Sequence, residues 1–297
     1  MSSSASDYLG KYRLLRSIRA GSKAQVWEAI QEDGELRRRV ALKVLLRKFR
    51  DDKFEVDAMI HESNVGKSLD HENIIKIYEY QNVYNTPFIA MELFTARNLK
   101  IELRENTYDI ASKMKQVILR CAKSLDYLSK KGWVHCDVKP DNFLVDNKTG
   151  DVKLIDFSIA EKAKKGGLGA LFARKPKAIR GTRSYMAPEQ IRRQGVDHRT
   201  DIYGFGCVVF EMLAGRLPYS ASNPDDLLRA HLQMGVPAVS SYSGATREIS
   251  ALVSRMMAKK PDDRPQSFEE VIREIEKISV YRAGHRPKKP APKQAEE

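Results

Sequence analysis

Residues 133–145 constrain what this chain can fold into more than any other stretch. They read Trp-Val-His-Cys-Asp-Val-Lys-Pro-Asp-Asn-Phe-Leu-Val, with polar side chains in the middle and apolar ones at both ends. Pro140 discourages a helix through the polar part and biases Lys139 toward an extended conformation. The pattern predicts a loop that a hydrophobic core holds at both ends.

The polar side chains of this loop suggest a reaction. Asp137 could take a proton from a hydroxyl group, and Lys139 could neutralise charge on a transferring phosphate. Asn142, together with Asp156 further along the chain, could hold a divalent metal ion through oxygen atoms.

The stretch resembles the catalytic loop of the eukaryotic-type (Hanks-type) Ser/Thr protein kinases, His-Arg-Asp-x-Lys-Pro-x-Asn, in a form like that of bacterial members. Cys136 stands where the family usually has Arg. The resemblance implies an α+β, bilobal protein-kinase fold. Its small lobe, residues 12–91, is mainly antiparallel β with one helix, and its larger lobe, residues 92–281, is mainly α. The alternative is a structural loop in an inactive member of the same fold.

Size and composition set wider limits. A chain of 297 residues, 42% hydrophobic and 31% charged, suits one or two globular domains. The net charge of +13 implies attraction to anionic partners, but it does not choose between nucleic acid, acidic peptides, membrane headgroups and nucleotide phosphates.

The compartment is predicted from cysteines and apolar runs. Cys121, Cys136 and Cys207 lack Cys-x-x-Cys spacing, which favours reduced thiols in the cytoplasm over disulfides or a zinc site. No apolar run approaches the ~20 residues of a membrane span, and the Ser-rich start lacks a signal core. Residues 1–11 are expected to be a disordered lead and residues 282–297 a flexible basic tail.

In the small lobe, the patterns predict strands at residues 12–20, 24–31, 38–46, 73–79 and 87–91, a hairpin turn at 32–35 and a helix at 51–69. The loop between the first two strands resembles the family's Gly-x-Gly-x-x-Gly-x-Val, whose amides cover the ATP phosphates. Only the middle glycine, Gly21, is present, with Arg19 and Ala24 at the other two positions. Taken alone, this segment also fits a plain hairpin.

The third strand carries Val-Ala-Leu-Lys, which resembles the family's Val-Ala-Ile-Lys. The resemblance implies that Lys43 reaches the α- and β-phosphates and pairs with Glu62 on the helix. Solvated side chains are the alternative for both residues. Gly66 stands one helical turn later, where the family has a bulky apolar residue, so we expect a gap in the packing and an easily displaced helix.

Residues 91–94 resemble the hinge between the lobes, where the Glu92 carbonyl and the Phe94 amide would meet the adenine edge. Ordinary core packing is the alternative for Met91. The whole set of implied ATP-binding residues is Ile18, Gly21, Val26, Ala41, Lys43, Glu62, Met91, Glu92, Phe94 and Leu144.

An apolar-periodic helix at 111–131 would deliver the catalytic loop, and a hairpin of residues 143–145 and 152–155 would follow it. Asp156-Phe157-Ser158 resembles the family's Asp-Phe-Gly. The resemblance implies that Asp156 and Asn142 hold Mg²⁺ (or Mn²⁺). Ser158 lacks the backbone freedom of glycine, which would restrict flips of this motif.

Residues 161–193 contain ten Lys or Arg against two Glu. They end in Gly-Thr-Arg-Ser-Tyr-Met-Ala-Pro-Glu, which resembles the family's activation segment and peptide platform. Thr182 would then lie near Asp137 and Lys139, and Glu189 would pair with Arg264. A solvated basic loop is the alternative for the middle of the segment. A buried helix is expected at 201–213, whose Asp201 would hold the backbone of the catalytic loop, and a last helix at 267–280.

The resemblance implies ATP-dependent transfer of the γ-phosphoryl group to Ser or Thr hydroxyls of protein substrates. The basic segment is a candidate surface for acidic partners. A thiol cannot bind a phosphate as the family's Arg does, so we expect that the activation segment is not switched through a contact with Cys136. The alternative function is a pseudokinase scaffold or nucleotide sensor that acts through protein partners. No motif supports a third class, nucleic-acid binding driven by charge.

Overall fold

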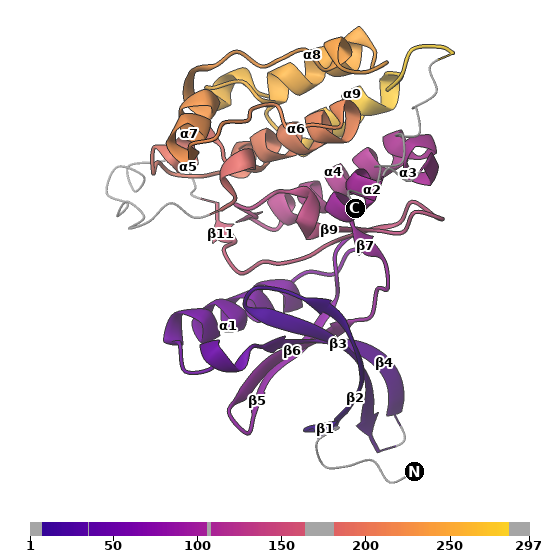
Figure 1. The fold of residues 1–297 in the computed structure, drawn as a ribbon, viewed down its shortest axis with the longest axis vertical. Helices are drawn as coiled ribbons and strands as arrows, with labels where there is room; N and C mark the ends of the chain where they lie inside the picture. Colours follow the sequence, from indigo (N-terminus) through magenta and orange to yellow (C-terminus); the bar gives the residue numbers. More distant parts are fainter. Residues whose placement is uncertain (1–7, 35, 106–107, 164–180, 285–297) are drawn as a thin grey trace, which may run out of the picture. The chain divides into compact units, whose positions relative to one another are not determined.

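A computed structural model describes residues 8–34, 36–105, 108–163 and 181–284. The chain divides into two compact units, shown in Figure 1. The N-terminal unit comprises Met1–Thr95 and Ile155–Ile159, and the C-terminal unit comprises Ala96–Leu154 and Ala160–Glu297.

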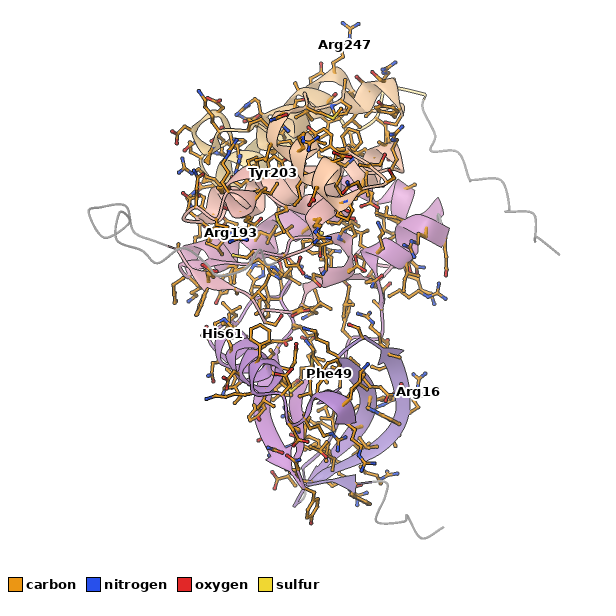
Figure 2. All side chains as sticks on the ribbon, turned by 60° about the vertical axis from the view of Figure 1, so that its left-hand side comes forward. Arg16, Phe49, His61, Arg193, Tyr203 and Arg247 are labelled. Carbon is orange, nitrogen blue, oxygen red and sulfur yellow. The ribbon has the colours of Figure 1, made fainter. Side chains whose placement is uncertain are left out.

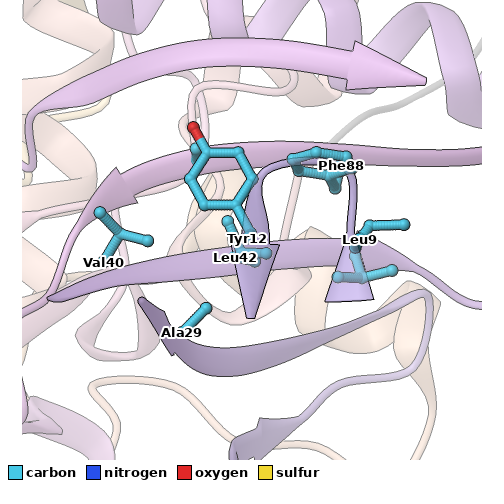
Figure 3. Packing of buried hydrophobic residues seen from close by; sticks show 8 residues of the cluster. Leu9, Tyr12, Ala29, Val40, Leu42 and Phe88 are labelled. Atoms are coloured by element: carbon cyan, nitrogen blue, oxygen red, sulfur yellow. The ribbon is translucent and has the colours of Figure 1, made fainter. Parts of the chain in front are cut away.

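The N-terminal unit is built on a six-stranded antiparallel sheet with the strand order β1-β2-β3-β4-β6-β5. Apolar residues of its strands form one core cluster, in which the Tyr12 and Phe88 rings meet edge to face with centroids 5.6 Å apart (Figure 3). The strands are β1 (Tyr8–Leu9), β2 (Tyr12–Ala20), β3 (Ala24–Asp33), β4 (Leu36–Leu45), β5 (Ile77–Val83) and β6 (Thr86–Glu92).

The strands predicted at residues 12–20, 24–31, 38–46 and 87–91 are therefore present, with small changes at their ends. The one predicted at 73–79 is displaced, because the observed strand begins at Ile77. Its predicted start is a turn in which His71 accepts the backbone N–H groups of Asn73 and Ile74 at 3.0 Å each. Amides used in this turn cannot also pair in the sheet. The lead predicted as disordered contains β1, which pairs with β2.

Helix α1 (Lys53–Lys67) packs against β5 and β6 of the same unit. It begins where the Asp52 side chain accepts the N–H of Phe54, an N-cap that satisfies a free helical donor. The predicted gap at Gly66 is wrong. Gly66 is buried, and a Cβ atom there would lie 2.3 Å from Cδ1 of Ile77, so the Ile77 side chain already fills the space.

The C-terminal unit is mainly helical, with a short β hairpin. Its helices are α2 (Leu99–Glu105), α3 (Tyr108–Ser112), α4 (Met114–Lys130), α5 (Pro188–Ile191), α6 (His198–Ala214), α7 (Pro224–Gln233), α8 (Arg247–Met256) and α9 (Phe268–Lys277). Its strands are β7 (Arg97–Asn98), β8 (Trp133–Val134), β9 (Phe143–Val145), β10 (Val152–Leu154) and β11 (Glu161–Lys162). Three-residue 3₁₀ turns at Pro140–Asn142 and Arg183–Tyr185 shape the loops discussed below.

Helix α6 is the centre of this unit, because all of its residues from Thr200 to Leu213 are buried. The helix predicted at 111–131 is split: α3 ends at Ser112 and α4 begins at Met114, since Lys113 leaves helical geometry at ψ 10°. In the predicted tail, Arg282 donates to the carbonyls of Ala245 and Ser240, whereas residues 285–297 lie outside the described part. No helix within the described ranges has the length and apolar character to cross a membrane.

Candidate active site

The catalytic loop, residues 133–145, is held in an unusual backbone conformation. Cys136 has φ +66°, which is uncommon for a residue with a Cβ atom. Asp201 on α6 accepts the backbone N–H groups of His135 at 2.6 Å and of Cys136 at 2.9 Å, as predicted. Gln190 donates to the carbonyl of Cys136 at 2.8 Å. Both polar backbone groups of Cys136 are thus fixed by side chains, which stabilises the strained turn.

Two buried side chains at this turn, Asp201 from α6 and Cys136, have shifted pKa values. Burial raises the pKa of Asp201 to about 7, against the two backbone N–H groups that favour its charged form. Burial also raises the pKa of the Cys136 thiol well above its ordinary value, and the nearby carboxylate of Asp201 adds to the shift. Cys136 is 8% exposed, so its side chain offers neither a charge nor an accessible thiolate.

The Asp137 carboxylate is fixed on both oxygens. Lys139 Nζ donates to Oδ2 at 2.6 Å, and Thr182 donates to Oδ1 from its backbone N–H at 2.8 Å and from its hydroxyl at 2.9 Å. The Thr182 hydroxyl also accepts from Lys139 at 2.9 Å. The predicted proximity of Thr182 to the other two residues is therefore confirmed. This arrangement orients a carboxylate and an ammonium group side by side.

Asn142 is 4% exposed and closes the loop. Its Nδ2 donates to the backbone carbonyl of Asp137 at 2.8 Å. Its amide oxygen accepts no hydrogen bond from the described residues, and oxygen is the atom through which an amide binds a hard cation.

The predicted peptide platform, residues 181–193, contacts this loop and is held in place by two contacts that involve charged side chains. Glu189 and Arg264 form the predicted ion pair, buried and bidentate at 2.7 and 2.8 Å. A second anchor was missed from the sequence: Tyr185 donates to Glu211 at 2.5 Å, and Lys100 donates to the same carboxylate at 2.5 Å. No motif signals it, because its members lie on α2, the platform and α6.

In the N-terminal unit, Lys43 on β4 and Glu62 on α1 form the predicted pair. Lys43 Nζ donates to both carboxylate oxygens, at 2.8 and 2.7 Å, and Glu62 is 4% exposed. Asp156 lies in the same unit, with its Oδ1 3.8 Å from Lys43 Nζ. One ammonium group thus stands between two carboxylates.

These charges set the protonation of the cluster. Burial lowers the pKa of Lys43, but the charges of Asp156 and Glu62 outweigh it, so the net shift is upward and the ammonium form is retained. Burial raises the pKa of Glu62 to about 7, opposed by the charge of Lys43.

Ser158 makes a contact that a glycine could not. Its hydroxyl donates to Asp156 Oδ1 at 2.7 Å, and its backbone N–H donates to the same atom at 3.3 Å. Asp156 itself has φ +68°, a strained conformation. The sequence indicated only the lost freedom of glycine. The added hydrogen bond depends on side-chain rotamers, which no motif records.

The predicted phosphate loop is the turn between β2 and β3. Gly21 donates to the carbonyl of Ala24 at 2.9 Å, and a Cβ atom on Gly21 would lie 2.9 Å from that oxygen, so the turn needs glycine here. Val26 pairs with Arg19 and Lys43 on the neighbouring strands. Ile18 lies at an irregularity of the β2–β3 register.

The predicted adenine contacts fall in both units. Ala41 is buried on β4 and pairs with Met91 on β6, so these two residues lie side by side. Glu92 ends β6, where its N–H donates to the carbonyl of Lys76 at 2.8 Å, and Phe94 follows in the connection out of the unit. Leu144 is buried on β9 of the C-terminal unit.

Known proteins are similar in sequence to this chain over most of its length. The chain is 33% identical over 264 residues to the serine/threonine-protein kinase PknJ of Mycobacterium tuberculosis, which covers 87% of this chain and 44% of PknJ. It is 31% identical over 271 residues to a protein of Clostridium acetobutylicum named as a probable serine/threonine-protein kinase, covering 90% and 40%. It is 28% identical over 267 residues to the serine/threonine-protein kinase PrkC of Bacillus subtilis, also covering 90% and 40%.

The chain therefore spans less than half the length of each of these relatives. The family model described as the protein kinase domain matches residues 12–275. That match takes in strands β2 to β6 and α1 of the N-terminal unit and, in the C-terminal unit, the catalytic loop, the platform and α6. This chain belongs to the protein kinase domain family.

Proposed function

We propose that this chain transfers the γ-phosphoryl group of ATP to Ser or Thr hydroxyls of protein substrates. The observation that carries the proposal is the fixed pair of Asp137 and Lys139, both held by Thr182. A positioned carboxylate next to a positioned cation suits the removal of a hydroxyl proton while charge develops on a transferring phosphate. The serine/threonine specificity named for the relatives fits a Lys two residues after the catalytic Asp.

In this proposal Asp137 orients the acceptor hydroxyl and takes its proton, and Lys139 neutralises charge on the phosphoryl oxygens. Positioning and charge neutralisation supply most of the rate enhancement in such reactions. Lys43, held by Glu62, would bind the α- and β-phosphates. Gly21 would let the backbone approach the phosphates, while Ile18, Val26, Ala41, Met91, Glu92, Phe94 and Leu144 would bind the adenine.

Asn142 and Asp156 would hold Mg²⁺ or Mn²⁺, which when bound neutralises phosphate charge. Their oxygen atoms suit a hard cation. Within the described ranges, no group of three or more His, Cys, Asp or Glu could hold a metal by itself. This donor set fits an ion that takes its remaining ligands from the nucleotide and from water, as Mg²⁺ commonly does.

We also propose that the chain has the two predicted lobes. Residues 12–91 would supply most of the ATP-binding residues, and residues 92–281 would supply Asp137, Lys139 and the two metal ligands. A cytoplasmic setting is proposed as well, and the three cysteines, all free and buried, support it.

The test is phosphate transfer by the purified chain with ATP, Mg²⁺ and a Ser/Thr-containing acceptor. Asp137→Asn should lower kcat by about 10²–10⁴-fold, because it removes the general base while keeping the shape of the side chain. Asp225→Asn, at an exposed position of α7, is the control and should keep the activity.

Equal transfer by wild type and Asp137→Asn would reject the assignment. A thermal shift with ATP but no transfer by the wild type would make the chain a nucleotide-binding module instead.

A further inference from the structure

Three arginines of the peptide platform have exposed side chains that make no ion pair with a described residue. Arg183, Arg192 and Arg193, here called the arginine triad, are all exposed. Within the described ranges none of their side chains makes an ion pair or hydrogen bond. Most exposed cations are solvated, so their position decides whether the triad has a role.

The triad is tied to the catalytic loop at two points. Arg183 directly follows Thr182, whose backbone N–H lies 2.8 Å from the Asp137 carboxylate. Arg192 and Arg193 directly follow the short helix α5, which carries Gln190, and the Gln190 side chain donates to the carbonyl of Cys136 at 2.8 Å. The triad therefore borders the two segments through which the platform contacts the catalytic loop.

The carboxylates that hydrogen-bond the platform within the described ranges are paired with cations, Asp137 with Lys139 among them. Glu189 is buried against Arg264. Glu211, below Tyr185, is paired with Lys100 at 2.5 Å. Between residues 181 and 193 there is no other acidic residue. Residues 181–193 thus carry three Arg against one Glu, a net positive charge.

The segment that precedes the platform also has no hydroxyl side chain that could carry a phosphate to the triad. Residues 159–181 contain no Ser, Thr or Tyr. Thr182 and Tyr185 use their hydroxyls for Asp137 and Glu211. Cys136, where the family has an arginine that binds such a phosphate, is buried. Ser184 is the remaining hydroxyl of the platform and is half-buried, whereas the arginine triad is exposed and open to a group from outside the chain.

We propose that the arginine triad binds acidic side chains of the protein substrate, so that the kinase prefers Ser or Thr flanked by Asp or Glu. This inference rests on the proposed function, since it names the substrate class of the same site. Exposed charge pairs are individually weak, but three cations around one short peptide act together and also speed the encounter.

The test uses three peptides that differ only in the residues flanking one Ser: acidic, neutral and basic. Wild type should show kcat/KM about tenfold higher for the acidic than for the neutral peptide, and lowest for the basic one. Raising the salt concentration should shrink the difference. Transfer to all peptides with equal efficiency overturns this inference but keeps the proposed function. No transfer to any peptide overturns both.

Variants assign the preference to the triad. Arg183→Gln, Arg192→Gln and Arg193→Gln combined should make acidic and neutral peptides equal substrates while transfer to the neutral peptide is retained. The charge reversal Arg183→Glu should lower the acidic-to-basic ratio further. Arg247→Gln is the matched control, because Arg247 is exposed on α8 and Figure 2 shows it well separated from Arg193.

A preference for acidic peptides that survives in the triple variant overturns the assignment to the triad. A single-stranded oligonucleotide provides the last comparison. If the triple variant loses its affinity for the oligonucleotide while its peptide preference is unchanged, the triad serves nucleic acid and the proposal fails.

Discussion

Ser158 shows how a single departure from a family pattern can add an interaction. Glycine is usual at this position, and its replacement removes backbone freedom. In exchange, the Ser158 hydroxyl donates to Asp156 Oδ1 at 2.7 Å, next to the contact from its own N–H group. Groups that hydrogen-bond a metal ligand fix its orientation and tune the affinity of the site. Ser158 is therefore a positioning residue for the proposed metal ligand Asp156.

Replacing Ser158 with Gly should raise the Mg²⁺ concentration needed for half-maximal activity by about tenfold, because Asp156 loses a hydrogen-bond donor. The KM for the peptide should stay unchanged, which separates this effect from general damage. Ser158→Thr keeps the hydroxyl and should restore the wild-type Mg²⁺ dependence. Identical Mg²⁺ curves for wild type and Ser158→Gly would contradict the role.

Motifs located the residues of the candidate site, but they did not reveal all of its contacts. The family motifs predicted the Lys43–Glu62 pair, and they also predicted that Asp201 accepts hydrogen bonds from the backbone of the catalytic loop. The Gln190 bond to Cys136 was not predicted, because it joins side chain and backbone 54 residues apart. Such contacts depend on packing and rotamers that a linear pattern does not encode.

Among the elements, α1 illustrates a compensation between two residues. The family position at Gly66 suggested a gap, yet Ile77, the first residue of β5, fills it. The strand was predicted to begin at residue 73, which placed Ile77 inside the strand and not at its start. The contact between Ile77 and Gly66 was therefore not anticipated. Helix α1, which carries Glu62, is thus closely packed on β5 in the same unit.

Replacing Gly66 with Ala should lower the free energy of unfolding by about 1–3 kcal/mol, since the added methyl group would collide with Ile77. Helix propensity alone predicts the opposite sign, a gain of about 1 kcal/mol. Denaturant titration decides between them. Asn64→Ala, on the exposed side of α1, is the control and should not destabilise. The double variant Gly66→Ala with Ile77→Ala should be less destabilised than the sum of the two single changes.

Helices were predicted unevenly in the C-terminal unit. The long, strongly apolar α6 and the periodic α4 and α9 were anticipated, with ends misplaced by a few residues. No prediction was made for α2, α7 or α8, which have 7, 10 and 10 residues. So few residues complete only two or three turns, too little to establish a period against the neighbouring loops.

At the scale of the molecule, the family assignment confirms the predicted kinase fold, and each unit has its own core. The core of the C-terminal unit contains a polar cluster that the proposed reaction does not use. His231 on α7 is buried, and its Nδ1 lies 2.9 Å from the hydroxyl of Tyr203 on α6. Burial, together with the nearby charge of Lys259, lowers the pKa of His231 to about 4.

This shift gives the folded chain a defined acid sensitivity. The ordinary pKa of His is about 6.5, so between pH 6.5 and 4 the unfolded chain binds a proton that the folded chain does not. The contribution of His231 to stability is therefore complete above pH 6.5, and up to about 3 kcal/mol of it is lost as the pH is lowered toward 4.

His231→Gln should flatten the dependence of unfolding free energy on pH in that window, since Gln does not titrate. Thermal or denaturant unfolding at pH 4 to 7 measures the slope. His198→Gln, at a half-buried position of the same unit, is the control. An unchanged slope in His231→Gln would show that other groups carry the acid sensitivity.

The three cysteines have a practical consequence. All of them are buried, and burial raises the pKa of each thiol. Maleimides react with thiolates, so the folded chain carries no ready target for them. A cysteine introduced at the surface, as in Arg247→Cys, would therefore accept a fluorophore selectively without prior removal of native thiols, and the product would carry a single dye at a known position.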